Sequence, residues 1–241
     1  MALLSDFGTG PYVGQMRLLL AAARPSLSVI DLISNLVPFR PDLAAYLLPG
    51  LVRDLPARTL YVCVVDPGVG SERGVLAVRI GKDWFLAPDN GLLSVLVQRQ
   101  RGAARAWRIH WRPCGMSATF HGRDLFIPLA VQISNGVLPG AVAIDPTEMQ
   151  GADWPAAAAK VCYIDHYGNS LSGLVAAEIP ADAVVHVAGA SVRGARTFSD
   201  VVPGTAFWYE NAFGLLEIAV NQGRADQTLG LRPGDPITFT T

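Results

Sequence analysis

Two glycine-rich loops carry the side chains of this chain that are best suited to chemistry on a small molecule. The first loop, residues 66–74, begins with Asp66 directly after an apolar run and contains Arg73 near its end. Its glycines and proline allow a tight turn that returns Arg73 toward Asp66. The second loop, residues 119–124, carries His121 beside a glycine. Carboxylates and imidazoles often accept protons in catalysis. These residues could equally form a structural ion pair and a structural histidine, so they are candidates for a site whose substrate is open.

Two further loops offer groups suited to a nucleoside. Asp6 ends a short strand-like run, where an aspartate could accept two hydrogen bonds from ribose hydroxyls. The glycines after it have the wrong spacing for a dinucleotide-binding fingerprint, and a helix-capping aspartate is the alternative interpretation. Asp165, Tyr167 and Asn169 place a carboxylate, an aromatic face and an amide in one turn. A purine nucleoside with an amino-acid tail needs such groups, although a hairpin turn uses similar residues.

The elements that must position these loops alternate between strands and helices in the first half of the chain. Apolar runs predict strands, and longer segments bounded by proline predict helices. This order is typical of a largely parallel sheet flanked by helices, in which ligands bind at the carboxyl ends of strands. The predicted strands are 2–5, 27–33, 60–65, 75–80, 84–87 and 105–111, and the predicted helices are 12–24, 41–55, 92–100 and 124–134.

Residues 139–159 lose this periodicity and are rich in proline, glycine and alanine. Beyond them, short strand-like runs follow one another, separated by Gly, Asn, Asp or Pro, without a long helix. We therefore predict two domains. Residues 1–150 form an α/β N-terminal domain with a mostly parallel sheet flanked by helices, and residues 159–241 form a small all-β C-terminal domain.

The composition favours a small-molecule partner. Of 241 residues, 16% are charged and 51% are hydrophobic, so extensive burial is expected, most simply by oligomerisation. The formal net charge is −1 and the basic residues are scattered, which argues against nucleic acid or a membrane as partner. The start of the chain, its longest apolar runs and its unpaired cysteines favour a soluble, cytoplasmic protein. Metal-ligand spacings and the serine-hydrolase elbow do not occur in the sequence.

Taken in chain order, the polar and glycine-rich segments resemble those of the S-adenosylmethionine hydroxide adenosyltransferase family, which is related to the fluorinase and chlorinase enzymes. Each motif is short, but their joint occurrence is specific and extends over nearly the whole chain. The segments are Ser5-Asp6-Phe7-Gly8, Tyr12-Val13-Gly14, Pro38-Phe39, Val65-Asp66-Pro67-Gly68-Val69-Gly70, Arg73, Pro88-Asp89-Asn90-Gly91, Thr119-Phe120-His121-Gly122-Arg123-Asp124, Asp165-x-Tyr167-Gly168-Asn169 and Leu216-Glu217-Ile218-Ala219.

The resemblance implies a homotrimer of two-domain subunits, with each active site between the N-terminal domain of one subunit and the C-terminal domain of its neighbour. It implies that S-adenosylmethionine is the substrate and that no cofactor or metal is needed. By motif, Asp66, Arg73 and His121 match the catalytic set of the hydrolytic members. Further matches imply that substrate is bound by Asp6, Phe39, Asp165, Tyr167, Asn169, Asn211, Ala212, Glu217 and Ala225.

The activity implied is hydrolysis of S-adenosylmethionine to adenosine and methionine. Asp66 and His121 are expected to hold a water in line with the ribose C5′–S bond and to accept its proton, while Arg73 orients Asp66. Two alternatives remain open: a halide transferase, in which Asp66 would repel the halide, and a sensor that binds adenosine or S-adenosylmethionine without turnover. The chain departs from the family at Ala212, where serine is common, and at residues 172–173, where Thr-Asn is common. These departures affect how the methionine carboxylate is held.

Overall fold

The computed structural model describes residues 1–100 and 102–241, and these divide into two compact units. The first unit comprises Met1–Ala45 and Asp54–Trp154, and the second comprises Tyr46–Arg53 and Pro155–Thr241. The second half of one helix therefore packs with the C-terminal strands, which the sequence periodicity did not indicate. No helix in the described residues is both long and apolar enough to cross a membrane.

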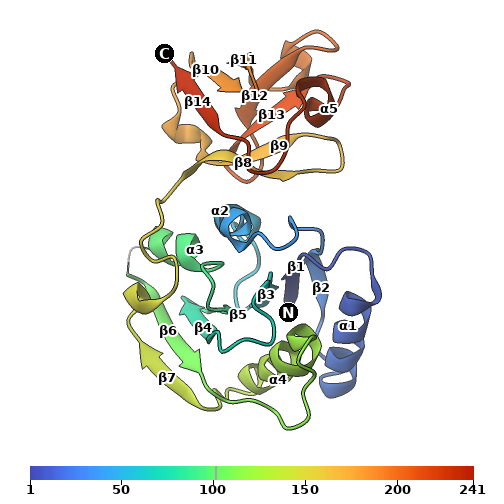
Figure 1. The fold of residues 1–241 in the computed structure, drawn as a ribbon, viewed down its shortest axis with the longest axis vertical. Coiled ribbons are helices and arrows are strands. Elements are labelled where there is room, and N and C mark those ends of the chain that lie inside the picture. Colours follow the sequence, from blue (N-terminus) through green and yellow to red (C-terminus); the bar gives the residue numbers. More distant parts are fainter. Residues whose placement is uncertain (101) are drawn as a thin grey trace. The chain divides into compact units, whose positions relative to one another are not determined.

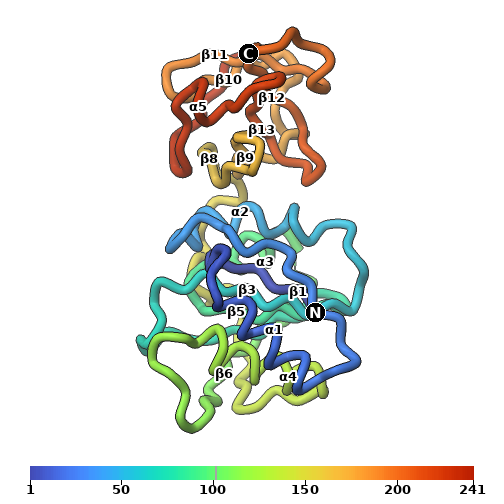
Figure 2. The backbone as a smooth tube through the Cα atoms, turned by 90° about the vertical axis from the view of Figure 1, so that its right-hand side faces the viewer, coloured from blue at the N-terminus to red at the C-terminus, as the bar shows by residue number. Residues whose placement is uncertain are grey.

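The described residues of the first unit form a seven-stranded sheet in the order β2-β1-β3-β5-β4-β6-β7. Helices α1 and α4 lie side by side on one face of this sheet, and α3 lies on the other (Figures 1 and 2). The strands are β1 (Ala2–Ser5), β2 (Ile30–Ile33), β3 (Leu60–Val64), β4 (Val75–Ile80), β5 (Asp83–Pro88), β6 (Ala104–Ile109) and β7 (Ala141–Ile144). The helices that begin in this unit are α1 (Pro11–Ala23), α2 (Pro41–Leu51), α3 (Ser94–Arg99) and α4 (Ile127–Ser134).

The sheet of this unit is mixed, so the prediction of a mostly parallel sheet is only partly right. Strands β2, β1, β3 and β5 run parallel, whereas the pairs β5–β4, β4–β6 and β6–β7 are antiparallel. The reversal begins at the tight turn between β4 and β5, where Gly81 adopts a positive φ of 58°. A turn this short joins neighbouring antiparallel strands, while a parallel pair needs a long crossover.

The buried core under α1 and α4 follows from their apolar faces. Met16 and Leu20 of α1 and Phe126 are each at most 1% exposed, and they pack on inward-facing residues of β3 and β4. Pro11 begins α1, where a missing amide hydrogen is tolerated. The predicted helix 124–134 begins instead as a π-helical turn over Gly122–Phe126 that continues into α4.

The described residues of the second unit contain a seven-stranded, largely antiparallel sheet in the order β14-β10-β11-β12-β13-β9-β8, with one parallel pair, β11–β12. Val161 exchanges backbone hydrogen bonds with Gly234 and Asp235, so β8 approaches the start of β14 and the sheet nearly closes into a barrel. The predicted all-β character holds apart from the short helix α5 (Ala225–Leu229) and two 3₁₀ turns, Ala176–Glu178 and Phe198–Asp200. The strands are β8 (Ala158–Ile164), β9 (Ser170–Val175), β10 (Val184–Val187), β11 (Ala190–Gly194), β12 (Ala206–Glu210), β13 (Leu215–Val220) and β14 (Ile237–Thr240).

Gly91 offers a test of how tightly the first unit is packed. Its φ is +92°, and an added Cβ would lie 2.3 Å from Cη2 of Trp154. We expect Gly91→Ala to lower the free energy of unfolding by about 3 kcal/mol, through backbone strain and overpacking together. Chemical denaturation measures this loss. Gly136→Ala is the matched control, because Gly136 has a φ of +80° but open space around the added carbon. It should lose only about 1–2 kcal/mol; equal losses for the two variants would show that the Trp154 contact is not tight.

Candidate active site

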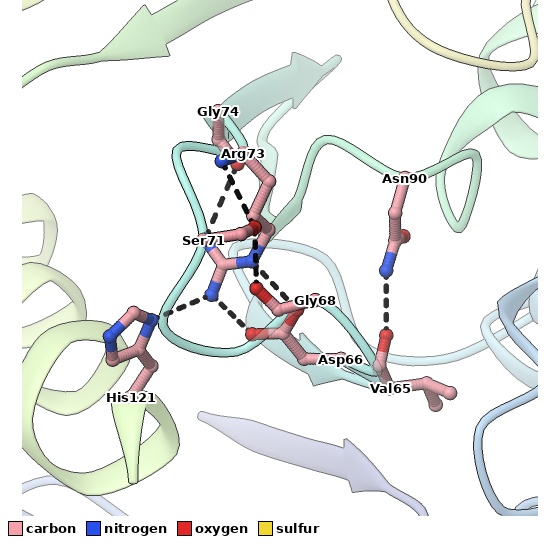
Figure 3. Close-up of polar contacts among 8 residues, drawn as sticks. All are labelled: Val65, Asp66, Gly68, Ser71, Arg73, Gly74, Asn90 and His121. Atoms are coloured by element: carbon pink, nitrogen blue, oxygen red, sulfur yellow. Dashed lines mark hydrogen bonds and ion pairs between the residues drawn. The ribbon is translucent and has the colours of Figure 1, made fainter. Parts of the chain in front are cut away.

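Asp66, Arg73 and His121 meet in the first unit and form one hydrogen-bonded chain (Figure 3). Arg73 Nε donates to Asp66 Oδ1 at 2.6 Å, and Arg73 Nη2 donates to Asp66 Oδ2. The same Nη2 lies 3.0 Å from Nδ1 of His121. The side chains of Asp66 and Arg73 are only 5% and 7% exposed. The planar guanidinium of Arg73 thus binds the carboxylate through Nε and Nη2, and it binds the imidazole through Nη2.

The arginine dictates where the proton of His121 sits. A guanidinium has donors and no acceptor, so Nδ1 of His121 must accept from Arg73 and the proton of the neutral ring lies on Nε2. Burial lowers the pKa of His121, and the positive charges of Arg73 and Arg112 lower it further, which favours this neutral form. Nε2 is buried and has no hydrogen-bond partner among the described residues. A buried N–H of this kind needs an acceptor, and a water oxygen is the simplest one.

Close packing of two loops brings Arg73 to His121. Gly70 has a φ of +83°, and a Cβ there would lie 2.9 Å from the carbonyl oxygen of Ala118. Only glycine permits both the backbone angle and this approach. Within the first loop, Ser71 Oγ donates to the Gly68 carbonyl at 2.7 Å (Figure 3). The amide of Asn90 secures the start of the loop by donating to the Val65 carbonyl at 2.8 Å.

An aromatic cluster links the Asp6 loop to the turn that carries His121. The ring centroids of Phe7, Tyr12 and Phe120 lie 5.2–5.8 Å from one another. Gly122 follows His121, and a Cβ at Gly122 would lie 3.0 Å from the Phe7 ring. The π-helical turn therefore packs directly on the residue that follows Asp6, so the two loops are fixed together. Turns of this type are frequent at functional sites.

Asp6 and Phe39, two residues expected to bind substrate, are joined in the structure. The backbone N–H of Phe39 donates to Asp6 Oδ2 at 2.9 Å. Phe39 adopts a φ of 63° and its side chain is 72% exposed. A bulky residue in this left-handed conformation is strained, and such strain is common at ligand sites. Burial raises the pKa of Asp6, and the charge of Asp66 raises it further.

A pocket of about 770 Å³ in the second unit contains four of the other predicted residues. Asp165 accepts from the backbone N–H of Asn169 at 2.8 Å and from its side-chain amide at 3.2 Å. Tyr167 is 72% exposed at this pocket, whereas Glu217 is only 4% exposed. Two further residues of the pocket wall, Phe198 and Tyr209, carried no signal of a binding role in the sequence.

Three expected contact residues lie outside this pocket. Asn211 and Ala212 line a different pocket of about 760 Å³ in the same unit. Asn211 is nevertheless connected to the first pocket, because its side chain donates to Glu217 at 2.8 Å. The side chain of Ala225 is fully buried in the hydrophobic core of the unit, so only its backbone is available to a ligand.

The described residues contain no cluster of His, Cys, Asp and Glu that could hold a metal ion. The groups of the candidate site are therefore a carboxylate fixed by arginine, a neutral imidazole that presents an N–H, and a second carboxylate at Asp6. Such a set can bind a water molecule, accept a proton from it and hold the hydroxyls of a sugar.

Known protein families and individual proteins match this chain over most of its length. Residues 1–143 match the family model of the SAM hydroxide adenosyltransferase N-terminal domain, and residues 159–238 match that of the C-terminal domain. A protein from Thermus thermophilus named (R)-S-adenosyl-L-methionine hydrolase is 35% identical over 97% of this chain and 96% of its own length. One of the same name from Salinispora arenicola is 34% identical over 98% of this chain and 95% of its own.

Two solved structures have a similar fold over nearly the whole chain. An uncharacterized conserved protein from Thermotoga maritima has a TM-score of 0.87 and 28% identity, with 99% of both chains covered. A conserved hypothetical protein from Thermus thermophilus has a TM-score of 0.77 and 32% identity, with 99% of this chain and 98% of that one covered. The two matched domain models together span most of the sequence. The chain belongs to the SAM hydroxide adenosyltransferase family.

Proposed function

We propose that this protein hydrolyses S-adenosylmethionine to adenosine and methionine. The observation that carries the proposal is the buried chain of Asp66, Arg73 and His121, which ends in an N–H without a partner among the described residues. Family membership supplies the substrate, and the relatives named as S-adenosylmethionine hydrolases match over nearly the full length. Asp66, Arg73 and His121 are proposed as the catalytic residues.

The reaction asks the protein for positioning more than for strong acid or base catalysis. Water oxygen forms a bond to C5′ while the C5′–S bond breaks, and the electron pair of that bond converts the sulfonium into the neutral thioether of methionine. The leaving group needs no protonation. Because the attacking water becomes a strongly acidic oxonium as the C–O bond forms, a carboxylate of ordinary basicity suffices to accept its proton. Holding water and carbon in line can contribute about 7–11 kcal/mol in the best cases.

The hydrogen bonds of the site suggest different roles for Asp66 and His121. Asp66 accepts from two Arg73 nitrogens and retains lone pairs on both oxygens, so it is the proposed proton acceptor. His121 accepts at Nδ1 from Arg73 and its Nε2–H lies on the far side of the ring from Asp66 (Figure 3), so we assign it the role of holding Arg73, and through it Asp66, in place. This differs from the expectation that both residues accept the proton. Arg73 holds the Asp66 carboxylate in place.

Substrate contacts are proposed for both units. Asp6 is suited to the ribose hydroxyls and Phe39 to an apolar face of the nucleoside. In the second unit, Asp165, Tyr167 and Asn169 offer a carboxylate, a ring and an amide. We further propose a homotrimer, with domain limits at 1–150 and 159–241 and each active site shared between subunits; the mass in solution tests the trimer directly.

Product analysis tests the proposed activity. Purified protein incubated with S-adenosylmethionine should release adenosine and methionine in equal amounts, with or without chloride, as identified by mass spectrometry. The relatives are named for the (R)-S form, so both sulfonium epimers should be supplied, and we propose that the (R)-S epimer is turned over. Formation of 5′-chloroadenosine would identify a halide transferase, which the carboxylate of Asp66 disfavours by repulsion. Unchanged substrate that nevertheless binds would identify a sensor.

Removal of the proposed catalytic groups should abolish turnover but not binding. We expect Asp66→Asn and His121→Ala each to lower kcat by about 100-fold or more, the usual contribution of positioned acid–base groups. The adenosine Kd, measured by calorimetry, should change by less than about threefold because neither group is proposed to hold the nucleoside. His110→Ala is the control, since it removes an exposed imidazole elsewhere in the first unit. Near-normal kcat in both site variants would refute the role assignment.

The pH dependence of kcat tests the neutral form of His121. Protonation of Nδ1 would remove the acceptor for Arg73, so turnover should fall as the pH drops below the pKa of His121. Because this pKa is lowered, the decline should begin below the ordinary histidine value of 6.5. The charge of Arg112 is one cause of the lowering, so Arg112→Met should move the acid limb to higher pH. The shift will be modest because the Arg112 side chain is exposed and screened. A shift to lower pH, or none, would contradict this assignment.

A further inference from the structure

Glu217 is a buried carboxylate whose two oxygens both accept hydrogen bonds from the protein. It lies on β13, lines the pocket of the second unit and is 4% exposed. The hydroxyl of Tyr209, on the neighbouring strand β12, donates to Oε1. The side-chain amide of Asn211 donates to Oε2 at 2.8 Å. Burial raises the pKa of Glu217, whereas these two hydrogen bonds lower it. A buried carboxylate needs such donors.

Asn211 passes this restraint on to the turn between β12 and β13. Its side-chain oxygen accepts the backbone N–H groups of Phe213 at 2.9 Å and Leu215 at 3.0 Å. Its own backbone N–H donates to the Leu215 carbonyl at 3.0 Å. The Asn211 amide is therefore held at both ends, with its nitrogen on Glu217 and its oxygen on the turn. Loss of the Glu217 acceptor would leave a buried donor unsatisfied and free the side chain to rotate.

Glu217 also reaches the opposite wall of the pocket. The side-chain nitrogen of Asn169 donates to Asp165, at 3.2 Å from Oδ2, and this side chain also lowers the pKa of the nearby Glu217. Asn169 is 6% exposed and faces the pocket between these two carboxylates. One acidic side chain thus connects a phenol on β12, the β12–β13 turn and the loop that follows β8.

We propose that Glu217 is a positioning residue, which together with Tyr209 fixes Asn211 and Asn169 and so sets the shape of the substrate pocket. The family resemblance implied a direct contact between Glu217 and substrate, but both oxygens of its buried carboxylate already accept hydrogen bonds from the protein, which favours the indirect role. The inference rests on the proposed function, because it assigns the pocket of the second unit to the substrate of that reaction.

The two roles respond differently to a neutral side chain of the same shape. In Glu217→Gln the amide oxygen can accept from Asn211 while the amide nitrogen donates to the Tyr209 hydroxyl, which can also accept. We therefore expect Glu217→Gln to change KM for S-adenosylmethionine by less than about threefold, below the effect of one lost hydrogen bond. Glu217→Met keeps the length but has no such groups, and its KM should rise about tenfold, with kcat within about twofold, because remote binding is lost.

Tyr209 should affect substrate binding through its hydrogen bond to Glu217. Tyr209→Phe retains the carboxylate and removes its phenol donor, so KM should rise about threefold or more. The double variant Tyr209→Phe with Glu217→Met should be no worse than Glu217→Met alone, because the second change removes an interaction that the first has already destroyed. Tyr209→Phe also supplies the test if Glu217→Met does not fold.

Val185→Ala separates pocket geometry from general stability. Val185 is fully buried on β10, in the hydrophobic core of the second unit, and does not line the pocket. This variant should lower the melting temperature and leave KM unchanged. A KM for Glu217→Gln as high as that of Glu217→Met would show that the charge itself contacts substrate and would overturn the inference, as would an unchanged KM in Glu217→Met or Tyr209→Phe. Wild-type protein without turnover would refute the proposed function instead, and the same variants would then be compared by calorimetric binding of S-adenosylmethionine.

Discussion

The pairing of Arg73 with both Asp66 and His121 is the constraint on which the rest of the site depends. A guanidinium can only donate, so it places the negative charge on one side, the acceptor nitrogen of the imidazole on the other, and the imidazole proton at the far end. Lysine could not impose this order, because its single rotatable ammonium lacks the planar fork.

The fold brings the Asp66 loop and the His121 turn, which are far apart in the sequence, into contact. The Asp66 loop leaves β3 and the His121 turn begins the helical segment that ends in α4, and Gly70 lets the first loop touch the second. The charge-poor composition noted in the sequence agrees with a chain in which even Asp66, the proposed proton acceptor, is buried. Burial strengthens each electrostatic contact, since little water competes for it.

The sequence predicted best where local rules decide the structure. An apolar run followed by Asp66 and glycines indicated a strand and a tight loop, and β3 and its loop are present as expected. Strand β7 was missed because it lies within the proline- and glycine-rich stretch where periodicity lapses, and its pairing with β6 is decided by tertiary contacts. Residues 81–83 indicated the hairpin that joins β4 and β5, but the antiparallel pairing of β4 with β6 and of β6 with β7 was missed, because a hairpin turn says nothing of which strand pairs next.

The binding residues of the second unit show the limit of motif matching. The position of a residue in a motif does not reveal which hydrogen bonds its side chain makes to the rest of the protein. Ala225 faces the core, and Asn211 and Glu217 are engaged with the protein, while Tyr209 was hidden in an ordinary strand pattern.

Water is proposed to attack C5′ of the substrate, and turnover in water enriched in oxygen-18 tests this attack most directly. The account predicts the heavy isotope in the 5′-hydroxyl of adenosine and none in methionine; heavy oxygen in an amino-acid product released alongside methylthioadenosine would contradict it.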